Sequence, residues 1–145
     1  MPIQYLPTPA TIVLCDFSKG FEKPEMVKKR PAVVISPRLP RRDNLCAVVG
    51  FSGTESPYPV AYQCKLELDA PLPDPFPYAV WWVKADLIVT VGLKRLDLFR
   101  TQRDQSGKRK FLSPKVKPED FVRIQACVLH GLGFGHLTDS LPKPT

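Results

Sequence analysis

The chain has 145 residues, which is enough for one domain with a hydrophobic core of its own. Hydrophobic residues make up 43% and charged residues 24%, a balance that is typical of a globular protein and excludes a largely disordered one. The net charge of +7 indicates a polyanionic partner, nucleic acid first, although a basic balance can also serve solubility alone.

Targeting, membrane and metal signals are missing from the sequence. The start, MPIQYLPTPA, has neither the basic nor the apolar region of a signal peptide, and no run of about 20 apolar residues follows. We expect a cytoplasmic protein without membrane contact. The cysteines are far apart, with no CxxC pair and no nearby histidine, so we expect reduced, buried thiols and no metal or other cofactor. They are Cys15, Cys46, Cys64 and Cys127.

Apolar runs separated by 17 prolines predict short strands. β-branched and apolar residues fill 11–17, 30–36 and 45–51, as in strands that are buried on both faces. The polar loop at 18–29 is long enough to cover a site. Residues 62–68 alternate, which predicts a strand with Cys64, Leu66 and Leu68 on one face.

Two more strands are predicted at 78–84 and 87–91, followed by a basic hairpin at 99–111 that turns near Ser106 and Gly107. Six or seven short strands make a small barrel or a strongly bent sheet. We expect one domain over 1–145, with flexible ends at 1–9 and 138–145.

One helix is predicted to begin at Pro118, because proline suits the first helical position and Glu119 and Asp120 suit the positive end of the dipole. Gly131 or Gly133 would end it. An apolar stripe should pack on the barrel, and its residues are Phe121, Ile124, Val128, Leu129 and Leu132.

Cations gather in two regions, 23–42 and 94–110. In the first, the sequence KKRP places Arg30 where a loop enters a strand, so a planar guanidinium can be aimed at a phosphate while Lys28 and Lys29 attract it. Alternatively, Arg30 forms a surface ion pair with Glu22 or Asp16.

Hydroxyl and charged side chains also follow two strands. Ser52 and Thr54 flank a glycine at a strand exit, where they bind an oxyanion or simply form a polar turn. Lys84 and Asp86 would face the same side of an extended chain, as a phosphate-holding cation and a proton-moving carboxylate or as a solvated ion pair.

Two neighbouring tryptophans, Trp81 and Trp82, should point to opposite faces of their strand, so one fills the core and the other is available to stack on a base or a partner.

Taken in order, Asp16-Phe17, the segment RPAVVIS from Arg30, the segment VVGFS that ends at Ser52, and the segment KADLIVT from Lys84 resemble the PemK/MazF family of toxin–antitoxin toxins. The resemblance covers about residues 10–98. It implies an SH3-like barrel that forms homodimers and cleaves single-stranded RNA without metal until a cognate antitoxin blocks it. Contact with DNA would occur only through the antitoxin complex.

The resemblance makes Arg30 the phosphate-stabilising arginine, Ser52 the hydroxyl, and Lys84 and Asp86 the counterparts of an arginine and an aspartate. It implies attack by the RNA 2′-OH on its own phosphate. This sequence departs from the family pattern at three positions, Ala10, Lys84 and Val89, where glycine, arginine and arginine are common.

RNA contacts are expected from the basic hairpin, which can compensate for the cation missing at Val89, and from the loop residues around the site. The expected residues are Lys28, Lys29, Thr54, Arg100, Arg103, Lys108 and Arg109. Two rival functions remain, a catalytically weak module that binds RNA or an antitoxin, and a toxin of the same fold that targets DNA gyrase.

Overall fold

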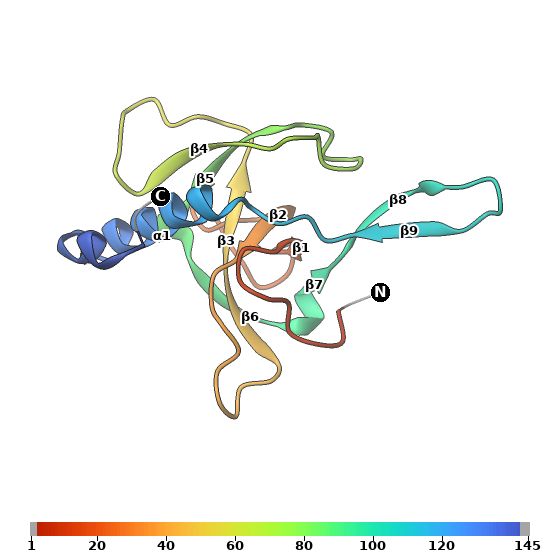
Figure 1. Cartoon of the computed structure of the whole chain (residues 1–145), viewed down its shortest axis with the longest axis horizontal. Coiled ribbons are helices and arrows are strands. Elements are labelled where there is room, and N and C mark those ends of the chain that lie inside the picture. Colours follow the sequence, from red (N-terminus) through yellow and green to blue (C-terminus); the bar gives the residue numbers. More distant parts are fainter. Residues whose placement is uncertain (1–2, 143–145) are drawn as a thin grey trace.

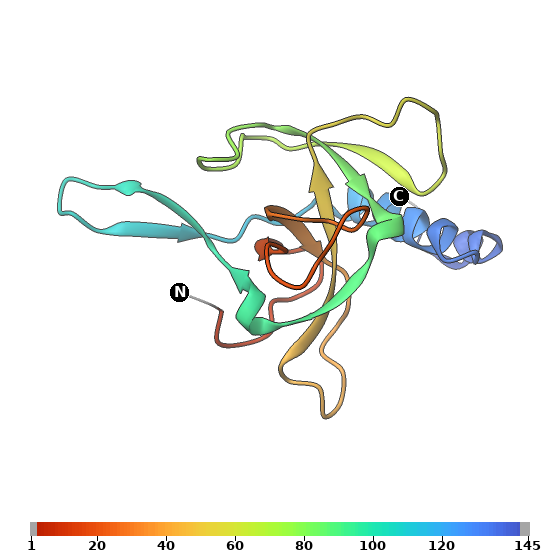
Figure 2. The same cartoon turned by 180° about the vertical axis from the view of Figure 1, so that it is seen from behind.

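The computed structural model describes residues 3–142, apart from the side chain of Gln102. A small β barrel occupies the centre, a long hairpin projects on one side and a helix on the other (Figure 1, Figure 2). The elements in chain order are β1 (Ile12–Asp16), β2 (Lys29–Val34), β3 (Leu45–Ser52), β4 (Gln63–Glu67), β5 (Val80–Lys84), the 3₁₀ helix η1 (Ala85–Leu87), β6 (Val89–Gly92), η2 (Leu93–Arg95), β7 (Leu96–Asp97), β8 (Phe99–Arg103), β9 (Arg109–Leu112), α1 (Pro118–Gly131) and η3 (Gly135–Ser140).

The barrel is completed by the chain itself. β1, β2 and β3 are antiparallel neighbours, β6 pairs with the first half of β3, and β7 pairs with β1. Because η2 joins β6 directly to β7, these strands surround a common interior. Alternate residues of each strand fill that interior, and they include Val13, Cys15, Ala32, Val34, Cys46, Val48 and Val91.

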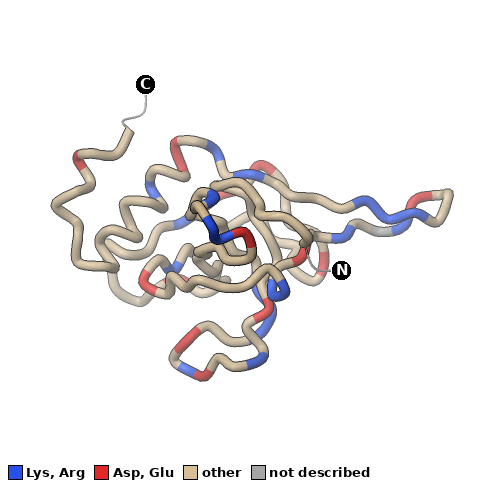
Figure 3. The backbone as a smooth tube through the Cα atoms, turned by 90° about the horizontal axis from the view of Figure 1, so that it is seen from below, with Lys and Arg blue, Asp and Glu red and all other residues tan. Residues whose placement is uncertain are grey.

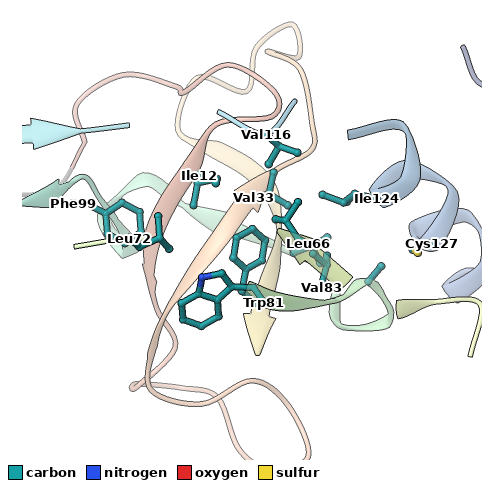
Figure 4. Close-up of a cluster of buried hydrophobic side chains, with 13 residues drawn as sticks. Ile12, Val33, Leu66, Leu72, Trp81, Val83, Phe99, Val116, Ile124 and Cys127 are labelled. Carbon is teal, nitrogen blue, oxygen red and sulfur yellow. The ribbon is translucent and has the colours of Figure 1, made fainter. Parts of the chain in front are cut away.

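A second hydrophobic cluster lies outside the barrel, between the sheet and α1. The second half of β3 pairs with β5, and β5 pairs with β4. Figure 4 shows Val33, Leu66 and Val83 on the side of this cluster that faces Ile124 of α1, with Trp81 farther from the helix. The expected fold class, mostly β with an SH3-like barrel and a C-terminal helix, is confirmed.

The helix begins as predicted, with Pro118 in its first turn and no side-chain cap from Lys117. It ends before Gly133, whose φ of +82° is the left-handed conformation that glycine adopts readily. The apolar stripe is shorter than predicted, because Leu132 is 51% exposed. The basic hairpin and the alternating strand β4 are confirmed.

The strand predicted at 87–91 is wrong at its start. Leu87 belongs to η1, and β6 begins at Val89. Ala85 is completely buried, so the chain turns inward there instead of continuing β5. The short strand β7 and the 3₁₀ helices, which depend on contacts distant in sequence, were not predicted.

Described parts of both terminal segments have defined contacts. The Ile3 amide donates to the Leu96 carbonyl at 3.0 Å, and Ile3 and Leu6 pack against the barrel cluster. η3 runs through residues 138–140. Flexibility at 1–9 and 138–145 stays a prediction, and residues 1–2 and 143–145 lie outside the described part.

Phe51→Ala should lower the free energy of unfolding by about 3–5 kcal/mol, because a fully buried ring would leave a cavity beside Trp81, whose ring centroid is 6.1 Å away. Urea unfolding measures this. Leu39→Ala is the control, since Leu39 is 50% exposed and its loss should change stability by less than about 0.5 kcal/mol. Equal effects of the two substitutions would contradict the described core.

Candidate nucleic-acid site

The site is built on one row of residues that crosses three strands. Ser52 of β3 lies opposite Trp82 of β5, and Trp82 lies opposite Lys65 of β4. Residues directly opposite each other in antiparallel strands share a face, so the three side chains form one continuous row. Lys84 and Gln63 form the next pair on the same face. Trp81 points the other way, and it is the one of the two tryptophans that fills the core.

Arg30 extends this row on β2. Ala32 pairs with Gly50, so continuing the register by two residues places Arg30 level with Ser52. The side chain is half-buried, and its Nε donates to the Val27 carbonyl at 3.0 Å. Within the described residues this is its one hydrogen bond, and no carboxylate pairs with it. The alternative of an ion pair with Glu22 or Asp16 is therefore wrong, and the terminal guanidinium nitrogens remain for an anion.

The 18–29 loop reaches the same face. Met26 is buried against Gly50, so closely that a Cβ at position 50 would lie 2.9 Å from the methionine Cε. The absence of a side chain at Gly50 therefore lets the loop lie against β3, two residues before Ser52.

Asp16 anchors the start of this loop. Its carboxylate accepts hydrogen bonds from the Ser18 amide at 2.8 Å and from the Ser18 hydroxyl. These bonds, led by the hydroxyl, and the charges of Lys29 and Arg95 hold the Asp16 pKa below its ordinary value. Arg95 also donates to the Lys19 carbonyl at 2.7 Å, which ties the loop to η2.

Lys84 and Asp86 are arranged differently from the prediction. Lys84 ends β5 and its Nζ donates to Gln63 Oε1 at 3.0 Å. Asp86 lies in η1, where the chain is not extended, so the spacing argument that placed both residues on one side of a strand is wrong. Asp86 is exposed beside the end of α1, since a Cβ at Gly131 would lie 3.1 Å from its Cα.

The turn after β3 bonds to itself. The Thr54 amide donates to Ser52 Oγ at 3.1 Å, so this conformation does not present that amide to an oxyanion. Thr54 is exposed and Ser52 is half-buried. The hydroxyl of Ser52 remains on the face of Arg30, but a complete oxyanion pocket at this turn is not formed here.

Lys29, the lysine next to Arg30, does not lie on the same face as Arg30. Lys29 pairs with Asp16 across β1 and β2, so it faces the opposite side of the sheet from Arg30. There it lines an open cavity of about 760 Å³ together with Arg100 and Arg109. Lys28 is exposed and has a left-handed φ of 76°.

The hairpin β8–β9 projects from the barrel and carries cations along both strands (Figure 3). Arg103 pairs in register with Arg109, and the Arg100 guanidinium lies 5.9 Å from the centre of the Phe111 ring. Asp104 Oδ1 accepts the amides of Ser106 and Lys108, which fixes the tip. Arg103, Lys108 and Arg109 are exposed. The expected RNA contacts therefore fall into two regions, the Arg30 face and the hairpin.

The environment of Val89 explains why this position holds an apolar residue where arginine is common in the family. It packs against the barrel cluster and pairs with Val48 of β3. A cation at this position would be directed into the hydrophobic interior, so this barrel has an apolar residue there.

Among residues 3–142, no group of three or more His, Cys, Asp or Glu side chains could hold a metal ion. In the same residues, none of the helices has the length and apolar character needed to cross a membrane. All four cysteines are free thiols; Cys15, Cys46 and Cys127 are buried as expected, but Cys64 is only half-buried. Burial raises the Cys15 pKa to about 12.

A family profile described as PemK-like, MazF-like toxin of type II toxin–antitoxin systems matches residues 8–119. The chain belongs to this family. The resemblance seen in the sequence is thus confirmed, and Arg30, Ser52 and Lys84 all fall within the matched region of this PemK-like chain. No curated protein sequence gives a significant match.

Solved structures share the fold of this PemK-like toxin at 18% identity. An endoribonuclease in complex with its cognate antitoxin, from a mycobacterial species, covers 96% of this chain and 100% of its own, with a TM-score of 0.59. MazF (Form-I) from Deinococcus radiodurans covers 90% and 99%, with a TM-score of 0.59. MazE-MazF (Form-II) from the same organism covers 90% and 98%, with a TM-score of 0.54.

Ser18→Ala should raise the Asp16 pKa toward its ordinary value, because the carboxylate loses the hydroxyl bond that most favours its charged form. Since the folded pKa is lowered, the contribution of Asp16 to stability is present above the unfolded pKa and is lost as pH falls through the folded one. Carboxyl ¹³C NMR titration measures the shift. Ser106→Ala is the matched control, because it should raise the pKa of Asp104 and leave that of Asp16 unchanged.

Proposed function

We propose that this PemK-like chain is an endoribonuclease toxin that cleaves single-stranded RNA. The observation that carries the proposal is the position of Arg30, whose terminal guanidinium nitrogens bond to no other described residue and which lies level with Ser52 at the end of the barrel. A planar guanidinium binds two phosphate oxygens at once. The names of the structural neighbours, endoribonuclease and MazF, support the same activity.

In the proposed reaction the 2′-oxygen of a ribose attacks the adjacent phosphorus, and the bond to the 5′-oxygen of the next nucleotide breaks. The products are a 2′,3′-cyclic phosphate and a 5′-hydroxyl. Arg30 binds the phosphate as its charge grows, Ser52 donates to a phosphate oxygen, and Lys84 adds a positive charge from β5. With these groups neutralising the phosphate, the reaction proceeds without metal.

The proton transfers need a base and an acid. We assign the proton released by the 2′-hydroxyl to Asp86, an exposed carboxylate in η1 directly after β5. The departing 5′-oxygen takes its proton from Lys84 or from water. Lysine is a point charge without the fork of arginine, so its contribution is smaller than that of Arg30.

The same proposal includes the partners of the toxin. It acts in the cytoplasm as a homodimer, a cognate antitoxin covers the Arg30 face, and DNA is contacted only through the toxin–antitoxin complex. Two structural neighbours support the antitoxin, since one is described with its cognate antitoxin and another as MazE-MazF. Lys28, Lys29, Thr54 and the hairpin hold the flanking RNA.

Arg30→Ala should reduce RNA cleavage in excess chelator by about 10²–10³-fold, because it removes the donors that stabilise the transition-state charge. Cleavage of a long single-stranded RNA by purified protein, with product ends identified, measures this. Arg30→Lys should retain part of the activity. Arg38→Ala is the control, because Arg38 is an exposed arginine paired with Asp43.

Activity that requires an added divalent ion would contradict the metal-free mechanism. Equal cleavage by wild type and Arg30→Ala would contradict the role of Arg30. RNA that is bound but never cut would favour the RNA-binding module instead.

Reversing the hairpin charges, Arg103→Glu with Arg109→Glu, should weaken RNA binding and make its dependence on salt shallower. Each lost phosphate contact should change the slope of log K against log salt by about 0.7. Filter binding at several salt concentrations measures both effects. Arg41→Glu with Arg42→Glu is the matched control, since both are exposed and lie on another loop. Identical slopes for the two double variants would remove the hairpin from the RNA site.

A further inference from the structure

Trp82 is an aromatic side chain that the core does not use. Its neighbour Trp81 is 4% exposed, lies in the second hydrophobic cluster and donates its indole N–H to the Tyr78 carbonyl at 3.0 Å. Trp82 is only half-buried and belongs to neither cluster. An aromatic ring held on a strand without a packing role is available for a ligand.

The indole N–H of Trp82 is also available. Within the described residues it has no hydrogen-bond partner, and no buried side-chain nitrogen or oxygen there is left unsatisfied. If the Trp82 N–H were shielded from solvent, it would be a buried nitrogen without a partner; since there is none, this N–H reaches solvent. The ring therefore offers both a stacking face and a hydrogen-bond donor.

The neighbours of Trp82 in the row indicate what the ligand is. On one side lie Ser52 and, level with it, Arg30, and on the other side lies Lys65. Adjacent strands are about 4.8 Å apart, so anion-binding groups flank the indole at successive strand spacings. In a single-stranded nucleic acid each base projects from a sugar that lies between two phosphates, and cations with interleaved aromatic rings are typical of proteins that bind it.

A cavity of about 400 Å³ opens at Trp82. The loop 55–60 forms its other wall, where Tyr58 is 74% exposed and, like Trp82, belongs to neither hydrophobic cluster. Glu55 and Lys65 also line the cavity, so polar groups lie within reach of a bound ring. A concave site with two aromatic residues and a few polar groups suits a planar heterocycle better than an aliphatic chain.

We propose that Trp82 and Tyr58 bind one nucleobase of the RNA, beside the phosphate held by Arg30 and Ser52. This inference rests on the proposed function, because it extends the RNA site from the Arg30 face across β5 toward β4. Trp82 is a binding residue that positions the RNA strand and contributes to the choice of cleavage site. Lys65, whose Nζ lies 3.2 Å from Glu67 Oε1, holds the phosphate on the far side of that base by exchanging this exposed carboxylate for it.

The test uses the full chain and a 2′-O-methyl single-stranded RNA, which binds without offering a 2′-hydroxyl for attack. The chain has two tryptophans, so Trp81→Phe leaves Trp82 as the sole indole and keeps an aromatic ring in the core. Saturable quenching of its fluorescence on titration with RNA is expected. If Trp81→Phe does not fold, the difference in quenching between wild type and Trp82→Phe gives the same information.

Trp82→Ala should weaken binding of this RNA by about 5- to 150-fold, the range for loss of one stacked base. Trp82→Phe should restore most of the affinity, because it keeps the aromatic face, and Tyr58→Ala should cause a smaller loss. The urea midpoint should change little, since the ring lies outside both clusters. On cleavable RNA, Trp82→Ala should also alter the nucleotide preference next to the cut.

The outcomes separate this inference from the function on which it rests. Cleavage that depends on Arg30, with affinity and cut sites unchanged in Trp82→Ala, would overturn the base site and leave the nuclease intact. Quenching and weakened binding without any cleavage would keep the base site and overturn the nuclease. Absence of both binding and cleavage would overturn both proposals. An equal loss of affinity in Trp82→Phe and Trp82→Ala would overturn the stacking role of Trp82.

Discussion

The structure depends on the shared strand β3, which pairs with β6 along its first half and with β5 along its second. Successive residues point into two different cores, with Val48 inside the barrel and Val49 and Phe51 in the cluster under α1. All three are completely buried, so the second half of β3, from Val48 to Phe51, has no solvent-facing side before Ser52. The burial of both faces holds the end of β3 in place, and that end is where the candidate site begins.

Alternation along β2 then divides the positive charge between two surfaces. Arg30 lies on the same face of β2 as Ala32 and Val34, whose side chains fill the barrel interior. Lys29 points to the other side of the sheet, with Asp16. Consecutive cations in the sequence therefore serve separate regions, the Arg30 face and the cavity at the base of the hairpin. A strand enforces this separation because its side chains alternate strictly.

The groups on the Arg30 face differ in how firmly they are held. Arg30 is fixed by a strand and by its bond to Val27, which limits the rearrangement needed to bind a phosphate. Lys84 is held by one bond to Gln63, an uncharged partner that a phosphate can displace. Position 89 contributes no charge because Val89 is part of the barrel wall. In the proposed reaction, this arrangement concentrates the chemistry on Arg30, with weaker support around it.

Local patterns in the sequence determined the elements of this protein. Runs of β-branched residues specified β1, β2 and β3, alternation specified β4, and Pro118 with its acidic neighbours specified the start of α1. The motif around Arg30 was equally local, since Pro31 and the strand that follows it are adjacent in the chain. Alternation within β5 placed Trp81 and Trp82 on opposite faces, but which of the two enters the core was decided by the packing of the strand.

Only the tertiary structure decided how these elements meet. The ring closed by η2 and β7, the level position of Arg30 and Ser52, and the row from Ser52 through Trp82 to Lys65 depend on strand register, which joins residues far apart in the sequence. The turn at Ala85 separated Lys84 from Asp86 because burial of that alanine outweighed the continuation of the strand. Alternation determines which residues of a strand share a face, but only pairing with other strands determines what that face meets.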